Sequence, residues 1–115
     1  MGKDGLLGSF EELVLLAVVR ADGDAYGMTV RREIEARTGR EGTIGSVYAT
    51  LDRLEAKGWV ASSHAAGGEE RSGRARRFFR IRPDGVAALA AAREVREPMW
   101  DGIDLARIES DPGRA

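Results

Sequence analysis

Residues 42–59 read Gly-Thr-Ile-Gly-Ser-Val-Tyr-Ala-Thr-Leu-Asp-Arg-Leu-Glu-Ala-Lys-Gly-Trp, and this stretch decides the fold. Both of its ends carry helix signals. The Thr43 hydroxyl can accept from an unpaired N–H of a first turn, and Gly58 supplies the left-handed residue that ends a helix. The stretch therefore predicts one amphipathic helix of about four turns. Its buried stripe, at spacings of four and three, comprises Val47, Leu51 and Leu54.

The outward face of this predicted helix differs from an ordinary solvated face. Exposed helix faces are usually crowded with Lys and Glu, whereas the first turns here carry small or hydroxylated residues and one tyrosine. Such a face can approach another surface closely. The residues expected to point outward or to flank the stripe are Ser46, Ala49, Thr50, Arg53 and Lys57.

Two further helices are expected before this one. Ser9-Phe10-Glu11-Glu12 has the pattern of a capping box with Ser9 as the N-cap, and an apolar run follows it. Asp22-Gly23-Asp24 predicts a turn, and residues 25–38 predict a second helix that Gly39 ends. Two helices joined by a short glycine-containing connection, the second with a face that fits a groove, form the helix-turn-helix pattern.

Beyond the third helix the hydrophobic period changes to two, which indicates strands. Residues 59–63 predict one short strand, and residues 76–82 predict a second one with Phe79 and Ile81 facing the core. The connection at 65–75 is rich in Gly, Glu and Arg and is longer than a tight hairpin. This segment is typical of a strand-loop-strand wing.

The chain after Pro83 has a third character. It is alanine-rich with strong helix propensity, and apolar residues keep spacings of three or four across Pro98, which predicts a kinked helix that continues past the proline. The expected fold is mainly α with a small two-stranded β-wing. Its parts are a loose arm at 1–8, in which Leu6 and Leu7 are the packing candidates, a winged helix-turn-helix at 9–82, a terminal helix at 83–108 and a frayed tail at 109–115.

The composition excludes several function classes. The 115 residues contain no cysteine and one histidine, His64, so disulfides, thiolate sites and a typical transition-metal site are excluded. No nucleophile–base pair, phosphate loop or paired carboxylate motif is present, and we therefore expect neither an enzyme nor a cofactor. No apolar run approaches the roughly 18 residues that span a bilayer, and no signal peptide opens the chain. We therefore expect a cytoplasmic protein without a membrane partner. A domain this small has a limited core, so a partner subunit would help to stabilise it.

The net charge of −1 conceals a local basic cluster, because residues 71–82 hold six arginines and no lysine. Guanidinium groups suit phosphates and narrow minor grooves, so we expect Arg74, Arg76 and Arg77 to contact DNA, against the alternative of a solvated loop. The helix at 43–57 would read the major groove. Its expected DNA-binding residues are Thr43, Ser46, Tyr48, Ala49 and Arg53, although Arg53 could instead pair with Asp52 or Glu55.

Three stretches together resemble the PadR family of winged helix-turn-helix transcriptional regulators. They are Ala25-Tyr26-Gly27, Val47-Tyr48-x-x-Leu51-x-Arg53-Leu54-Glu55-x-x-Gly58, and Gly73-Arg74-Ala75-Arg76-Arg77-Phe78-Phe79-Arg80-Ile81, and the resemblance covers residues 8–90. It implies a homodimer joined by the terminal helix, a repressor role and a palindromic double-stranded DNA operator.

Some members of that family bind flat drugs between aromatic residues at the dimer interface. The resemblance therefore implies either a small-molecule effector pocket or simply a dimer core at Val95, Met99, Trp100 and Ile103. The alternative function is a winged-helix protein–protein adaptor without specific DNA binding, which the negative net charge leaves open.

Overall fold

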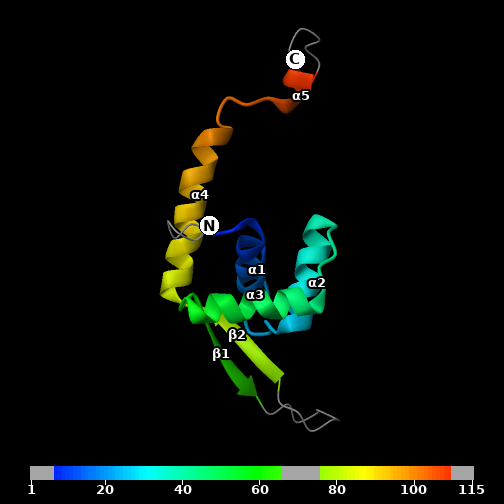
Figure 1. The fold of residues 1–115 in the computed structure, drawn as a ribbon, viewed down its shortest axis with the longest axis vertical. Coiled ribbons are helices and arrows are strands. Elements are labelled where there is room, and N and C mark those ends of the chain that lie inside the picture. The colour runs from blue at the N-terminus through cyan, green and yellow to red at the C-terminus, as the bar shows by residue number, and fades with distance from the viewer. Residues whose placement is uncertain (1–6, 66–75, 110–115) are drawn as a thin grey trace.

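Three helices form the body of the protein, and a two-stranded sheet and a long helix extend from it in opposite directions (Figure 1). The computed structural model describes residues 7–65 and 76–109. The body contains α1 (Ser9–Arg20), α2 (Gly27–Thr38) and α3 (Ile44–Ala56). β1 (Val60–Ala65) and β2 (Arg76–Ile81) form the wing, and α4 (Pro83–Trp100) and α5 (Leu105–Glu109) complete the described chain. The expected mainly helical fold with a small antiparallel wing is confirmed.

The core lies where the three body helices meet. The predicted stripe of α3 is confirmed, because Val47, Leu51 and Leu54 are all 0% exposed. Phe79 of β2 is also buried, as predicted, so the inner side of the wing belongs to the same core. The residues of α1 and α2 that share this cluster are Val14, Leu15, Ala17, Val18, Val30 and Ile34.

The predicted ends of α3 are confirmed. The Thr43 hydroxyl accepts from the Ser46 N–H at 3.0 Å, and Gly58 has a φ of 81°. One position on the helix was predicted wrongly, because Thr50 is buried and its hydroxyl accepts from Arg53 Nη2 at 3.1 Å. Thr50 lies three residues after Val47, so it belongs to the buried stripe and not to the flank.

The start of α1 differs from the sequence prediction by one residue. Gly8 and not Ser9 is the N-cap, and the Glu11 carboxylate, not that of Glu12, accepts from the Gly8 N–H at 3.1 Å. Leu7 explains the shift, because it is 2% exposed and packs in the core directly before Gly8. The packing expected of Leu7 within the predicted arm at 1–8 is therefore confirmed, and Leu6 lies among residues 1–6, outside the described part of the chain.

The second helix begins at Gly27, two residues later than predicted. Tyr26 is its N-cap, and the Tyr26 N–H donates to the Thr29 hydroxyl at 2.9 Å. Ala25 stays outside the helix because its carbonyl accepts from the Phe79 N–H of β2 at 2.8 Å. The predicted C-terminal glycine is confirmed, since Gly39 has a φ of 73°.

The wing strands pair antiparallel, with Val60 opposite Ile81 and His64 opposite Arg77. β1 begins one residue later and ends two residues later than predicted, and β2 ends at Ile81. Trp59 is excluded from β1 because its N–H donates to the Leu54 carbonyl at 2.9 Å and so completes the end of α3.

The terminal helix does not continue to residue 108 as predicted. α4 passes through Pro98 but ends at Trp100, and Gly102 has a φ of 80°. The Asp101-Gly102 pair is a turn signal that outweighs the apolar spacing of three and four. α5 is a separate short helix whose Arg107 N–H donates to the Asp104 carboxylate at 3.3 Å. Glu109, predicted to be frayed, belongs to α5, and residues 110–115 lie outside the described chain.

Candidate nucleic-acid interface

The outer face of α3 and the wing lie on the same side of the body. In Figure 1, α3 crosses the lower edge of the helical body and both strands extend below it. The exposed residues on the first two turns of α3 are Ile44, Gly45, Ser46, Tyr48 and Ala49. A side chain added at Gly45 would meet no described atom within 4 Å, so this face is open to a close approach.

Two of these exposed residues, Ile44 and Gly45, were not among the residues predicted to contact DNA. Gly45 precedes Ala49 by four residues, so the helical period could have placed both on one face. Ile44 carried no such signal, because an isoleucine next to a cap is normally assigned to the core. Its side chain places an exposed apolar group at the start of this face.

The hydroxyl groups at the start of α3 bind each other's backbone. Thr43 accepts from the Ser46 N–H, while the Ser46 hydroxyl donates to the Thr43 carbonyl at 2.9 Å. Accepting leaves the Thr43 hydroxyl with its own proton to donate, whereas the Ser46 oxygen keeps acceptor capacity. The pair therefore presents one donor and one acceptor at the exposed end of the helix.

The Tyr48 ring lies over Gly27 at the first turn of α2. A Cβ added at Gly27 would lie 2.3 Å from Tyr48 Cζ and 2.5 Å from the Tyr48 hydroxyl oxygen. Only glycine permits this approach. Tyr48 still has 37% of its surface exposed, so the residue packs on Gly27 and remains partly accessible.

Replacing Gly27 with alanine should lower the free energy of unfolding by about 1–3 kcal/mol, because the new methyl group overlaps the Tyr48 ring. Urea unfolding followed by circular dichroism would measure the change. In a Tyr48→Ala background the cost should disappear. Gly45→Ala is the matched control and should instead gain up to about 1 kcal/mol from helix propensity. Equal effects at Gly27 and Gly45 would contradict the packing described.

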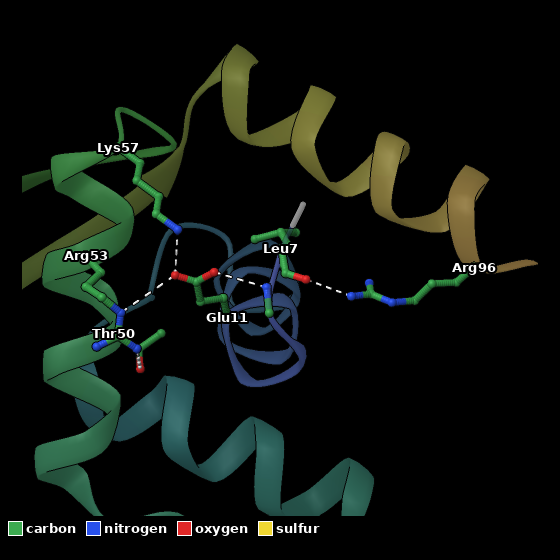
Figure 2. A network of polar contacts seen from close by, with 7 residues as sticks. Leu7, Glu11, Thr50, Arg53, Lys57 and Arg96 are labelled. Atoms are coloured by element: carbon green, nitrogen blue, oxygen red, sulfur yellow. Dashed lines mark hydrogen bonds and ion pairs between the residues drawn. The ribbon is translucent and has the colours of Figure 1, made fainter. Parts of the chain in front are cut away.

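Arg53 pairs with α1, and its predicted alternative partners, Asp52 and Glu55, were wrong. Its Nη2 donates to the Thr50 hydroxyl, and its Nε lies 3.7 Å from the Glu11 carboxylate (Figure 2). The side chain follows the flank of α3 that faces α1, whereas Asp52 and Glu55 lie on the flank that faces the wing. Arg53 has 56% of its side chain exposed.

Glu11 joins the start of α1 to the end of α3. Lys57 Nζ donates to its carboxylate at 2.8 Å, as Figure 2 shows. Burial acts to raise the pKa of Glu11, but the hydrogen bonds from Lys57 and the Gly8 N–H and the charges of Lys57 and Arg53 outweigh it. The pKa therefore lies below its usual value of 4.5, and the carboxylate is ionised at neutral pH.

The described arginines of the wing have different surroundings, and Arg74 lies outside the described residues. Arg76 is exposed, and its guanidinium carbon lies 4.4 Å from the centroid of the Tyr26 ring. Tyr26 in turn meets Phe78 edge to face at 5.5 Å. Arg77 is half-buried and forms ion pairs with Asp52 and Glu55 of α3.

The predicted dimerisation or effector residues are all exposed in the single chain. They are Val95, Met99, Trp100 and Ile103, with Met99 at 78% and Trp100 at 60%. The end of α4 extends away from the helical body (Figure 1). This structure of one chain brings none of the four residues into the core.

A groove of about 570 Å³ lies between α1 and α4. Sequence reasoning missed it, although the apolar run of α1 contains more residues than one buried stripe can use. Its lining is mostly apolar, with Glu12 and Arg93 as its charged residues. The apolar lining residues are Leu16, Val19, Ile81, Val86, Leu89 and Ala90.

Within the described ranges 7–65 and 76–109, no three His, Cys, Asp or Glu side chains gather closely enough to hold a metal ion. None of the helices in those ranges combines the length and the apolar character needed to cross a bilayer.

Comparison with known proteins agrees with this architecture. The family model described as the transcriptional regulator PadR-like family matches residues 15–91. The transcriptional regulator Rv3488 of Mycobacterium tuberculosis is 38% identical over 81 residues, which cover 69% of each chain.

Solved structures share the fold. A transcriptional regulator from Clostridium thermocellum superposes with a TM-score of 0.64 at 25% identity, covering 78% of this chain and 84% of that one. A PadR family transcriptional regulator from Eggerthella lenta gives a TM-score of 0.65 at 23% identity, covering 86% and 82%. With its helix-turn-helix body, its wing and a family match across most of its length, the chain belongs to the PadR-like family of transcriptional regulators.

Proposed function

We propose that this regulator binds a palindromic double-stranded DNA operator as a homodimer and represses transcription by occluding the promoter. The observation that carries the proposal is the open outer face of α3, which lies beside the arginine-bearing wing. A helix with small residues at its N-terminal turns can enter a major groove, while guanidinium groups bind the flanking phosphates.

Each predicted contact has a chemical role in this arrangement. Thr43 donates and Ser46 accepts at the start of α3, Ala49 permits close approach, and the Tyr48 hydroxyl donates to a phosphate. The basic side chains that we assign to the DNA backbone or minor groove are Arg53, Arg74 and Arg76.

The exposed apolar surface supports the homodimer. Met99 and Trp100 of α4 and the groove between α1 and α4 would all be solvated in a single chain. Large exposed apolar surfaces on a small domain are typical of interaction sites. A two-fold axis relating the terminal helices would present two copies of α3 to successive major grooves, with half-sites about one helical turn apart.

The contacts of Arg96 support communication between the terminal helix and α3. Arg96 Nη2 donates to the Leu7 carbonyl at 2.7 Å (Figure 2). Arg96 Nη1 also donates to the Glu12 carboxylate. The adjacent Glu11 forms ion pairs with Arg53 of α3 and with Lys57 directly after that helix. An effector bound among Val95, Met99, Trp100 and Ile103 would displace α4 and, through these contacts, change the separation of the two α3 helices.

Replacing Arg74 and Arg76 with alanine should weaken binding to all DNA sequences alike, because phosphate contacts carry no base information. The slope of log K against log salt concentration should fall by roughly one phosphate for each arginine. Fluorescence anisotropy at several salt concentrations, with a duplex that the wild-type protein selects from a random pool, would measure it. An unchanged slope would remove both side chains from the interface.

The same experiment separates the regulator from a protein–protein adaptor. Enrichment of one sequence family from the random pool supports the regulator. A pool that stays random after repeated selection would contradict DNA recognition by this chain.

A further inference from the structure

Arg77 joins the wing to α3 through two carboxylates. Its Nη1 donates to Asp52 Oδ1 at 2.9 Å, and its Nη2 donates to Glu55 Oε1. The other oxygen of Glu55 accepts from the Ser62 hydroxyl of β1 at 2.7 Å. One short cluster therefore connects α3 with both strands.

The surroundings of Arg77 favour this internal role over a contact with DNA. Its side chain is only 29% exposed, and its guanidinium carbon lies 4.8 Å from the centroid of the Phe79 ring in the core. Burial acts to lower the pKa of Arg77, but the hydrogen bonds and charges of Asp52 and Glu55 outweigh it and raise the pKa. Hydrogen bonds from the Ser62 hydroxyl and from Arg77 lower the pKa of Glu55, so both sides of the cluster are charged at neutral pH.

Asp52 shows why the cluster matters for recognition. Its side chain is 60% exposed on α3, and an unpaired carboxylate beside the DNA-facing turns would repel phosphates. Arg77 pairs with this carboxylate and so joins β2 to α3 in the absence of DNA. Because guanidinium is a planar fork, it can hold two carboxylates at once, whereas a lysine holds them as a point charge.

We propose that Arg77 is a positioning residue, a brace that sets the wing against α3 and neutralises Asp52, in place of the DNA contact expected from the sequence. The brace rests on the proposed DNA-binding function, because its purpose is to prepare two DNA-contacting surfaces together. Preorganisation of this kind lowers the ordering cost of binding.

A double-mutant cycle tests the brace with the duplex that the wild-type protein selects. Arg77→Met keeps the packing on Phe79 and removes the charge, and it should weaken binding by at least about tenfold. In an Asp52→Asn, Glu55→Gln background the same change should cost less than about twofold, because the partners are already gone. The loss of two negative charges raises DNA affinity both with and without Arg77→Met in that background, so this increase cancels in the comparison.

The salt dependence distinguishes a brace from a phosphate contact. In the Asp52→Asn, Glu55→Gln background, where no carboxylate is left unpaired, Arg77→Met should leave the salt slope unchanged. The neighbouring Arg76→Met, the matched control, should lower the slope there by about one phosphate. In the wild-type background, Arg77→Lys should recover part of the affinity, and it carries the test if Arg77→Met does not fold. A slope lowered by Arg77→Met in the background without the carboxylates, equal losses in both backgrounds, or no loss in either would each overturn the brace.

Hydrogen exchange in the DNA-free protein separates failure of the brace from failure of DNA binding. Arg77→Met should speed exchange of the β2 amides by about tenfold, and Arg76→Met should not. If the wild-type protein selects no duplex, the proposed DNA function and the role of the brace in recognition both fail. Unchanged β2 exchange in a protein that does select DNA would overturn the brace alone.

Discussion

Replacing Leu51 with alanine is expected to lower the free energy of unfolding by about 2–5 kcal/mol. Leu51 is 0% exposed and lies in the core cluster that α3 shares with α1 and α2, so the lost side chain leaves a cavity among three helices. A domain of this size has only about 5–15 kcal/mol of stability, and DNA binding should be lost with the fold.

Urea unfolding of the Leu51→Ala variant would measure the effect. Ile44→Ala is the matched control, because Ile44 is an apolar residue of the same helix that is 37% exposed. Truncation at such a surface position typically changes stability by less than about 0.5 kcal/mol. Similar losses at the two positions would show that the inward and outward faces of α3 are assigned wrongly.

Replacing Gly85 with alanine is the second change with a large expected effect. A Cβ at this position of α4 would lie 2.3 Å from the Trp59 carbonyl oxygen and 2.8 Å from Ile81 Cγ1. The same carbonyl accepts from the Arg82 N–H at 2.9 Å, so the overlap separates α4 from the junction between α3 and the wing. We expect a loss at or above the upper end of the about 1–3 kcal/mol typical of overpacking.

Gly27→Ala is the appropriate comparison for Gly85→Ala, because its Cβ would also come within 2.3 Å of its obstacle. At Gly27 that obstacle is the end of the Tyr48 side chain, which can rotate, whereas at Gly85 it is backbone. Urea unfolding of both variants should therefore show the larger loss at Gly85. An equal or smaller loss there would contradict the close approach of α4 to Trp59.

The features predicted correctly from the sequence depend on neighbours in the sequence. The Thr43 cap, the left-handed Gly58 and the buried stripe of α3 all follow from residues within two turns of each other. The orientation of Phe79 toward the core likewise follows from the alternation of side chains along a strand. Local rules determine such features, so one sequence suffices to predict them.

The errors arise where distant residues compete with local signals. Gly8 and not Ser9 is the N-cap of α1, because Leu7 packs in the core. Ala25 lies outside α2, because its carbonyl accepts from the Phe79 N–H. Arg53 pairs with Glu11, which lies 42 residues earlier in the sequence (53 − 11). Arg77 pairs with Glu55 and Asp52, which lie 22 and 25 residues earlier (77 − 55 and 77 − 52). A helical or strand period carries no information about such pairs.

The candidate interface was predictable in outline and not in its chemistry. The outer face of α3 follows from its period, and the arginines of the wing follow from composition. The sequence does not show that the Thr43 hydroxyl accepts a backbone hydrogen bond whereas the Ser46 hydroxyl donates one. It also does not show that Arg77 pairs with a carboxylate of α3 whereas Arg76 lies on the Tyr26 ring.

Hydroxyl-radical footprinting on a duplex that the wild-type protein selects from a random pool tests the central claim most directly. Two copies of α3 and two wings bound to one operator predict two protected patches related by two-fold symmetry, about one helical turn apart. A single unsymmetrical patch, or protection that does not depend on the sequence of the duplex, would contradict recognition by a homodimer.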